Sequence, residues 1–322
     1  MKKKMKRIIS ILLVCALLVP LAACGGEAGG SGDDSIGPIV ISIPAATHGW
    51  MAAIAFWSQY KVDELDLANG IGYRILTAAD VIEQAGQIED LLALNPSAMV
   101  LLPHNSELSI AANAIEEQGV PMILFDRRVY SPRTAYVAGD NVQVGRYIAS
   151  GIVDTIGTEG IVALMNVPGA GTSALERVQG FHEVIDNYPN IQVVNFYMEL
   201  WTQEHGLQAG ADLLVAHSHI DAIASINCVP SLSILQAIRE AGRTEIQAIS
   251  GAGGWQPWIR AIYDNPDMHL FTATYFPSMI KDAIQVAYDL VHGAEIPETI
   301  IVPPTVITRA NAAQYFNDDT PY

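Results

Sequence analysis

The sequence predicts an α/β protein with parallel sheets, because short strands and amphipathic helices alternate from Pro38 onward. The strand-like runs are continuously apolar rather than alternating, as expected for strands buried on both faces of a parallel sheet. The order β-α repeats throughout, which favours a doubly wound sheet. The runs are too numerous for one compact sheet, so we expect two lobes.

The expected strands fall into two sets. The first set is PIVISIP (38–44), YRILTA (73–78), AMVLLP (98–103), PMILFD (121–126) and AYVAGD (135–140). The second set is GIVALMN (160–166), IQVVNFY (191–197), AIASI (222–226), EIQAIS (245–250) and LFTATY (270–275). The pattern changes near 138–141, where a strand ends and a helix begins. We expect the lobes to divide there.

Two of the helices between these strands have clear patterns. Helix 80–94 is expected to bury one face, which carries Ile82, Ala85, Ile88, Leu91 and Leu92. Helix 172–188 stops at Pro189. Asp80 with Glu83, and Ser173 with Glu176, are predicted capping boxes for the two helices.

The first 35 residues predict export and a lipid anchor. A basic cluster (residues 2–7) precedes an apolar run (8–21), which is shorter than the roughly 20 residues that a membrane span needs. The run ends in Leu-Ala-Ala-Cys, which resembles the bacterial lipobox, so we expect a lipoprotein signal peptide (1–23) and lipidation of Cys24. Residues 24–35 read as a flexible linker. The alternative is an ordinary secretory signal with a chance cysteine.

Charge and cysteine content limit the expected partners and bonds. Removal of the five cations in the signal changes the formal charge from −17 to −22, so nucleic acid is not an expected partner. Only Cys228 remains outside the first 24 residues, and no intrachain disulfide can form in a chain that begins at Cys24. We expect a monomer with no cofactor and no metal site.

Polar and aromatic residues follow several of the expected strands, where α/β sheets bind ligands. Planar polar groups can bond two neighbouring hydroxyls, and an aromatic face covers the C–H face of a ring, so this mixture suits a small polyhydroxy ligand. Structural roles remain open for each residue: satisfied loop histidines, core tryptophans, a structural salt bridge at 126–127 and a turn asparagine. The candidates are His48, Trp50, His104, Asn105, Asp126, Arg127, Asn227, Trp255 and Tyr275.

Residues 36–316 resemble the bacterial periplasmic sugar-binding proteins of the ribose-binding type. The matching stretches are IEDLLALNPSAMVLLP (88–103), VPMILFDRRV (120–129), YVAGDNVQVGRYIASGI (136–152), GTSALERVQGF (171–181) and VPPTVITRANA (302–312). The resemblance implies two Rossmann-like lobes joined by a three-crossover hinge, the periplasmic binding protein type 1 fold. Lobe 1 would comprise 36–138 plus 276–302, and lobe 2 would comprise 139–275 plus 303–322. It also implies ligand delivery to an ABC permease in the membrane.

Carried over residue by residue, the resemblance places an aromatic stacking pair near Trp50 and Met51, with His48 beside it. The family's Asp-Arg pair falls on Asp126 and Arg127, and its amide position on Asn227. Three positions depart from the pattern: Leu175 replaces an arginine, Gly253 an aspartate and Tyr275 a glutamine. These departures favour a less polar or smaller ligand than an ordinary pentose or hexose, such as a deoxy sugar, a polyol, a nucleoside or a furanosyl signalling molecule.

The sequence therefore predicts an extracytoplasmic solute-binding lipoprotein for an ABC importer, not an enzyme. The segment GAGTSA (169–174) matches a dinucleotide fingerprint, but no acidic residue ends the next strand at the expected distance of about 20 residues. A sensor that binds the same ligand without transport stays open, because it would use the same cleft.

Overall fold

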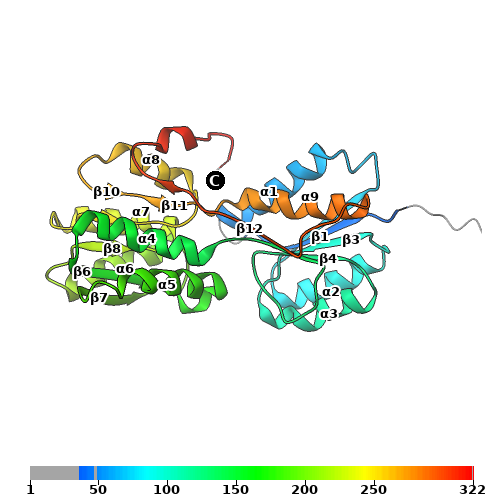
Figure 1. The fold of residues 1–322 in the computed structure, drawn as a ribbon, viewed down its shortest axis with the longest axis horizontal. Coiled ribbons are helices and arrows are strands. Elements are labelled where there is room, and N and C mark those ends of the chain that lie inside the picture. Colours follow the sequence, from blue (N-terminus) through cyan, green and yellow to red (C-terminus); the bar gives the residue numbers. More distant parts are fainter. Residues whose placement is uncertain (1–35, 47–48, 321) are drawn as a thin grey trace, which may run out of the picture. The chain divides into compact units, whose positions relative to one another are not determined.

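The computed structural model describes residues 36–46, 49–320 and 322, and Figure 1 shows its elements. Residues 36–322 group as one compact unit. The predicted signal peptide and linker (1–35), with Cys24, lie outside the described residues, and so does His48. In the part of the chain that is described, every helix is too short or too polar to cross a membrane.

The first sheet contains six parallel strands in the order β12-β5-β4-β3-β1-β2. Their bounds are β1 Ile39–Pro44, β2 Tyr73–Ala78, β3 Ala98–Leu101, β4 Met122–Phe125, β5 Ala135–Gly139 and β12 Thr299–Val302. Helices α1 (Gly49–Glu64) and α9 (Ile280–Val291) lie on one face, and α2 (Val81–Leu92) and α3 (Ser109–Glu117) on the other (Figure 1).

The second sheet is also parallel, in the order β10-β9-β8-β6-β7. Its strands are β6 Glu159–Asn166, β7 Asn190–Tyr197, β8 Ala222–Ala224, β9 Ala248–Ile249 and β10 His269–Leu270. Its helices are α4 Asn141–Ile156, α5 Thr172–Ile185, α6 Gln203–Ala216, α7 Cys228–Glu240 and α8 Gln256–Asp264. This strand order repeats that of β5-β4-β3-β1-β2, so both halves have the same doubly wound topology.

The chain passes between the two sheets three times: after β5, after β11 (Thr272–Ala273) and after β12. Strand β11 pairs antiparallel with β13 (Val306–Ile307), which ties the last two crossings together. The predicted fold class, with two lobes and three crossovers, is thereby confirmed. The residue bounds given above for the lobes stay a prediction.

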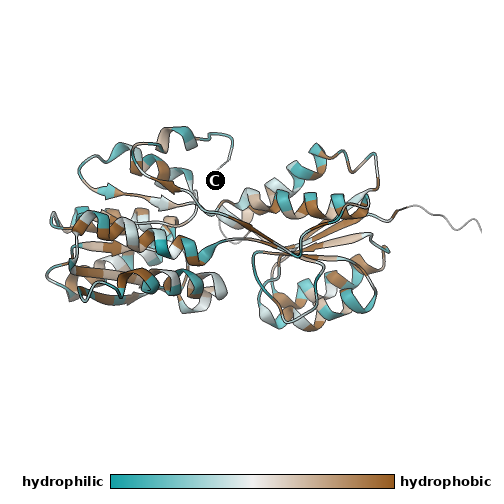
Figure 2. Ribbon diagram, in the orientation of Figure 1, coloured by the Kyte–Doolittle hydropathy of each residue, from teal (hydrophilic) through white to brown (hydrophobic). Residues whose placement is uncertain are grey.

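Strands β1, β3, β4, β5 and β8 are fully buried, as their continuous apolar runs predict. The edge strands β2 and β7 are partly exposed, so the prediction of burial on both faces is wrong for them. Ile39, Ile41 and Ile43 of β1 belong to the larger core, whereas Val40 between them belongs to the core under α2 and α3. In Figure 2 the strands at the centre of both sheets are mainly in the apolar colour. Neighbouring residues of one strand therefore face different helical layers.

The expected buried face of α2 is partly wrong. Ile82 is 81% exposed, and the buried position of that turn belongs to Gln84. The Gln84 amide donates to the Ser42 hydroxyl at 3.1 Å and to the Leu102 carbonyl at 2.9 Å, and it accepts from the His104 amide at 2.8 Å. These three bonds satisfy a buried polar side chain that hydrophobic periodicity does not anticipate.

One of the two predicted helix caps is present in part, and the other is wrong. Asp80 caps α2 through the Ile82 and Glu83 amides, but the Glu83 carboxylate accepts from Ala79 rather than from Asp80. The capping box predicted at 173 and 176 is wrong, because α5 begins at Thr172, and its N-cap, Gly171, has no side chain that could accept a bond.

One predicted strand is divided in two. The run 270–275 splits into β10, in the second sheet, and β11, which pairs with β13. The split occurs because the chain leaves the sheet here to begin a crossover.

Candidate ligand-binding cavity

A cavity of about 70 Å³ lies where residues of both lobes meet. It is lined by Trp50, Met51, Asp126, Arg127, Ala170, Ser173, Arg177, Trp201, Asn227, Val229, Ala252, Gly253, Tyr275 and Tyr322. Several of these follow the carboxyl ends of strands, where open α/β sheets bind ligands. Trp50 is near the start of the helix after β1, and Ser173 near the start of the helix after β6, the equivalent strand of the second sheet.

Asp126 follows β4 directly and is 8% exposed. Its φ of 60° lies in the left-handed region, which aspartate and asparagine tolerate better than most side chains. The backbone is fixed there by two bonds: the Asp126 amide donates to the Val137 carbonyl at 2.9 Å, and the Tyr136 hydroxyl donates to the Asp126 carbonyl at 2.6 Å. The carboxylate is thus held at the cavity wall.

Tyr275 follows β11 in the second crossover and links the lobes through its hydrogen bonds. Its hydroxyl donates to Asp126 Oδ1, and Asn141 Nδ2 donates to that hydroxyl at 3.4 Å. Trp50 Nε1 donates to the Tyr275 carbonyl at 3.2 Å. Burial, followed by the nearby Asp126 charge, raises the pKa of Tyr275 well above its usual value, so the phenol stays protonated and can donate.

Tyr275 approaches the backbone of β5 closely. A Cβ built on Gly139 would lie 2.4 Å from Tyr275 Cε2, so only glycine leaves room for the ring. The end of β5 and the second crossover are therefore packed together at the cavity.

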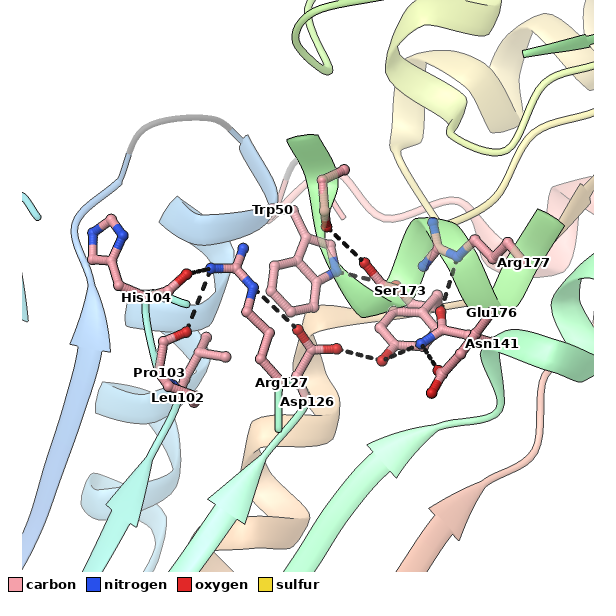
Figure 3. A network of polar contacts seen from close by, with 12 residues as sticks. Trp50, Leu102, Pro103, His104, Asp126, Arg127, Asn141, Ser173, Glu176 and Arg177 are labelled. Atoms are coloured by element: carbon pink, nitrogen blue, oxygen red, sulfur yellow. Dashed lines mark hydrogen bonds and ion pairs between the residues drawn. The ribbon is translucent and has the colours of Figure 1, made fainter. Parts of the chain in front are cut away.

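Arg177 lies on α5 and is 6% exposed. Its Nε donates to Asn141 Oδ1 at 2.9 Å, and its Nη1 donates to the Ile226 carbonyl at 3.0 Å (Figure 3 draws the first bond). Its guanidinium carbon lies 4.8 Å from the centroid of the Tyr275 ring, a cation–π contact. Burial lowers the pKa of Arg177, but arginine remains charged, so this side chain brings a desolvated positive charge to the cavity.

Arg127 brings a second cation. Its Nη1 donates to the His104 carbonyl at 2.6 Å, and its Nε lies 3.9 Å from Asp126 Oδ2. The lining thus combines one carboxylate, two guanidinium groups, an amide, hydroxyls and aromatic rings, which can bond several hydroxyls of a small ring. Among the described residues, no group of three or more His, Cys, Asp or Glu side chains could hold a metal ion.

Six predicted site residues line this cavity. They are Trp50, Met51, Asp126, Arg127, Asn227 and Tyr275. Asn227 also caps α7, because its Oδ1 accepts from the Val229 amide at 2.9 Å. Ligand contact by all six stays a prediction.

Three predicted site residues lie elsewhere. His104 Nε2 is 3.3 Å from the Ala78 carbonyl, and Asn105 accepts from the Glu107 amide to cap a short 3-10 turn. Trp255 precedes α8 and packs on the core. Local hydrogen bonds and packing account for these residues, and the structure does not bring them to the cavity. His48 lies outside the described residues.

The candidates omitted four polar or aromatic lining residues: Ser173, Arg177, Trp201 and Tyr322. Trp201 follows β7 at a short distance, so the same strand-end criterion could have found it. Tyr322 follows no strand of either main sheet, and its position gives no sequence signal. Leu175, which stands where the resembling family has an arginine, is 64% exposed.

Comparisons with known proteins agree with this geometry. A family model described as a periplasmic binding protein domain matches residues 39–295. The ribose import binding protein of Bacillus subtilis (strain 168) is 28% identical over 316 residues, covering 95% of this chain and 100% of that protein. The D-apiose import binding protein of Actinobacillus succinogenes is 27% identical over 223 residues, covering 67% of this chain and 70% of that protein.

Solved structures show the same fold. An ABC transporter solute-binding protein from Mycobacterium smegmatis, with bound glycerol, gives a TM-score of 0.78 at 23% identity, covering 89% of this chain and 99% of that chain. One from Bacillus halodurans, with bound myo-inositol, gives a TM-score of 0.78 at 18% identity, covering 88% and 98%.

Two matching lobes, three crossovers and a shared cavity define the class of two-lobed periplasmic binding proteins. The chain belongs to the periplasmic binding protein domain family.

Proposed function

We propose that this protein captures a small sugar or polyol in the cavity and delivers it to an ABC importer, without catalysis. The observation that carries the proposal is the grouping of Asp126 and Arg127 with Trp50 and Tyr275 on one cavity wall. A carboxylate and a guanidinium suit ligand hydroxyls, and an indole suits the apolar face of a ring. Relatives named for ribose and apiose import support the ligand class and the transport role.

The work of binding is divided between the lobes in this proposal. The first lobe supplies Asp126 and Arg127, and Trp201 on the second lobe supplies an aromatic surface, whereas the predicted site residue Trp255 does not line the cavity. We propose that the protein acts as a monomer, because a single chain builds both lobes and thereby both sides of the cavity.

A thermal-shift screen tests the proposal. The panel contains D-ribose, D-apiose, xylitol, myo-inositol, nucleosides and furanosyl compounds, with amino acids as the contrasting class. At 1,000 times its dissociation constant, a true ligand stabilises the folded protein by about 4 kcal/mol. We expect at least one sugar or polyol to raise the melting temperature by several degrees. A response to amino acids alone would contradict the sugar assignment.

We also propose that Cys24 is lipidated and holds the protein at the outer face of the membrane. The support is the sequence pattern of residues 2–24, followed by a stretch rich in Gly, Ser and acidic residues that separates the acyl site from the lobes. One acyl chain gives marginal binding and two give stable anchoring, so the two-chain form is the effective one.

Cys24→Ala is expected to abolish incorporation of labelled palmitate in bacterial cells and to leave ligand affinity unchanged. Cys15→Ala is the matched control, because Cys15 lies in the apolar run and should not be acylated; this variant keeps the label. Wild-type protein that takes up no label would contradict the anchor.

A further inference from the structure

Tyr322 lies in the cavity wall, although it comes from a segment remote in sequence from the other lining residues. Its side chain is 6% exposed and lines the cavity. Its Cε2 lies 3.3 Å from the place that a Cβ on Gly49 would take, and its Cε1 lies 3.8 Å from the equivalent place on Gly253. The ring therefore fills space between the start of α1 and the loop before α8.

Tyr322 and Cys228 together occupy the space beside Gly253. A Cβ on Gly253, where φ is 123°, would lie 2.9 Å from Cys228 Sγ. Burial, followed by the neighbouring Cys228 thiol, raises the pKa of Tyr322, so the ring presents a neutral phenol. Gly253 stands where the resembling family carries an aspartate. Here the Tyr322 ring and the Cys228 thiol lie where that side chain would project.

The segment before Tyr322 is anchored rather than loosely attached. Gln256 on α8 donates to the Tyr315 carbonyl at 2.9 Å and accepts from the Asn317 amide at 2.9 Å. Thr320 is buried, and its hydroxyl donates to the Tyr322 carbonyl. These bonds hold residues 315 and 317 against α8 and tie the Tyr322 backbone to Thr320.

We propose that Tyr322 is a specificity-determining residue that limits the cavity to a single small polyhydroxy ring and contacts that ring with its aromatic face. The inference rests on the proposed function. An aromatic wall of this size excludes a second sugar unit, and its face suits the C–H face of the first. A site that gains van der Waals contact in this way distinguishes ligands by their shape rather than by their number of hydroxyls.

Calorimetry with defined probes tests the size limit. D-ribose, xylitol and myo-inositol are the small probes, and sucrose and maltose are the large ones. We expect Tyr322→Ala to weaken binding of the best small probe at least tenfold. The ratio of small-probe to large-probe affinity should fall by more than tenfold. Tyr322→Phe should keep the wild-type ratio. Phe316→Ala is the matched control, because Phe316 is an aromatic residue of the same segment that packs on Tyr263 outside the cavity lining.

Alkylation of Cys228 provides a second measurement that needs no ligand. Burial raises the pKa of the Cys228 thiol to about 11, so little thiolate exists at pH 8. The Tyr322 ring and the thiol lie beside the same point at Gly253, so we expect loss of the ring to open the cavity towards Cys228. We expect N-ethylmaleimide to modify the Cys228 peptide at least tenfold faster in Tyr322→Ala, and at the wild-type rate in Tyr322→Phe and Phe316→Ala.

The outcomes separate the inference from the function on which it rests. Wild-type protein that binds no sugar or polyol of the thermal-shift panel contradicts the proposed function, while alkylation still decides whether Tyr322 forms the wall. Unchanged affinities and unchanged alkylation in a folded Tyr322→Ala variant overturn the inference. Tyr322→Leu replaces Tyr322→Ala in both measurements if circular dichroism shows that the alanine variant does not fold.

Discussion

We expect replacement of Asp126 by Ala to weaken ligand binding at least thirtyfold while the protein stays folded. The carboxylate is buried at the cavity and faces Arg127, so its loss leaves that cation without its nearest counter-charge. A bound ligand is expected to desolvate this pair, and removal of one partner of a desolvated charge pair costs about 2 to 5 kcal/mol of binding energy. Calorimetry with the best ligand of the thermal-shift screen measures the change.

Two further variants sharpen this test. Asp126→Asn keeps the shape and tolerates the left-handed backbone at φ 60°, so it removes the charge alone, and we expect most of the loss to remain. Asp140→Ala is the control, because Asp140 follows the neighbouring strand β5 and caps α4 through the Gln143 amide at 2.8 Å. It should lower stability by about 1 kcal/mol and leave affinity unchanged. Wild-type affinity in Asp126→Ala would leave a structural role as the explanation of Asp126.

Arg177→Ala is expected to lower the free energy of unfolding by about 3 kcal/mol. The substitution leaves Asn141 Oδ1 and the Ile226 carbonyl without a donor, and it opens a hole under the Tyr275 ring. Urea unfolding without ligand measures the effect, so that the loss of a cavity residue does not enter the result.

Arg146→Ala is the matched control for Arg177. Arg146 Nη2 lies 2.6 Å from Glu183 Oε2, but both side chains are solvent-accessible, and such pairs contribute about 0.2 to 1 kcal/mol. A loss in Arg177→Ala that is no larger than that of Arg146→Ala would mean that water or a neighbouring side chain replaces the guanidinium. Arg177→Met, which fills the same space, should fall between the two.

The sequence predicts the fold better than it predicts the site. Continuous apolar runs specify strands buried on both faces, and all ten expected strands are present, with the last one divided between two sheets. Strands β12 and β13 were not among them. Strand β12 has a short apolar run, Ile300–Val302, but it is a half-exposed edge strand that ends at Pro303. Strand β13 has two residues and lies outside both main sheets.

Position in the sequence predicts only some of the residues that line the cavity. The strand-end rule finds Asp126 and Asn227, which lie one residue and three residues past their strands. It also selects His104 and Asn105, whose side chains bond locally, because a pattern cannot show which way a loop side chain turns. Arg177 lies well inside α5 and Tyr322 lies beyond every strand, and only packing brings them to the wall.

The two hydrophobic cores have a consequence for cooperativity. The larger core runs without interruption from β1 and α1 through α9 to the strands of the second sheet, whereas the smaller one is confined to the layer of α2 and α3 against the first sheet. Lobes that share a continuous core unfold together, so each lobe's stability depends on the other. We therefore expect the α2–α3 layer to open more readily than the shared core, so that its amide protons exchange with solvent before those of the central strands.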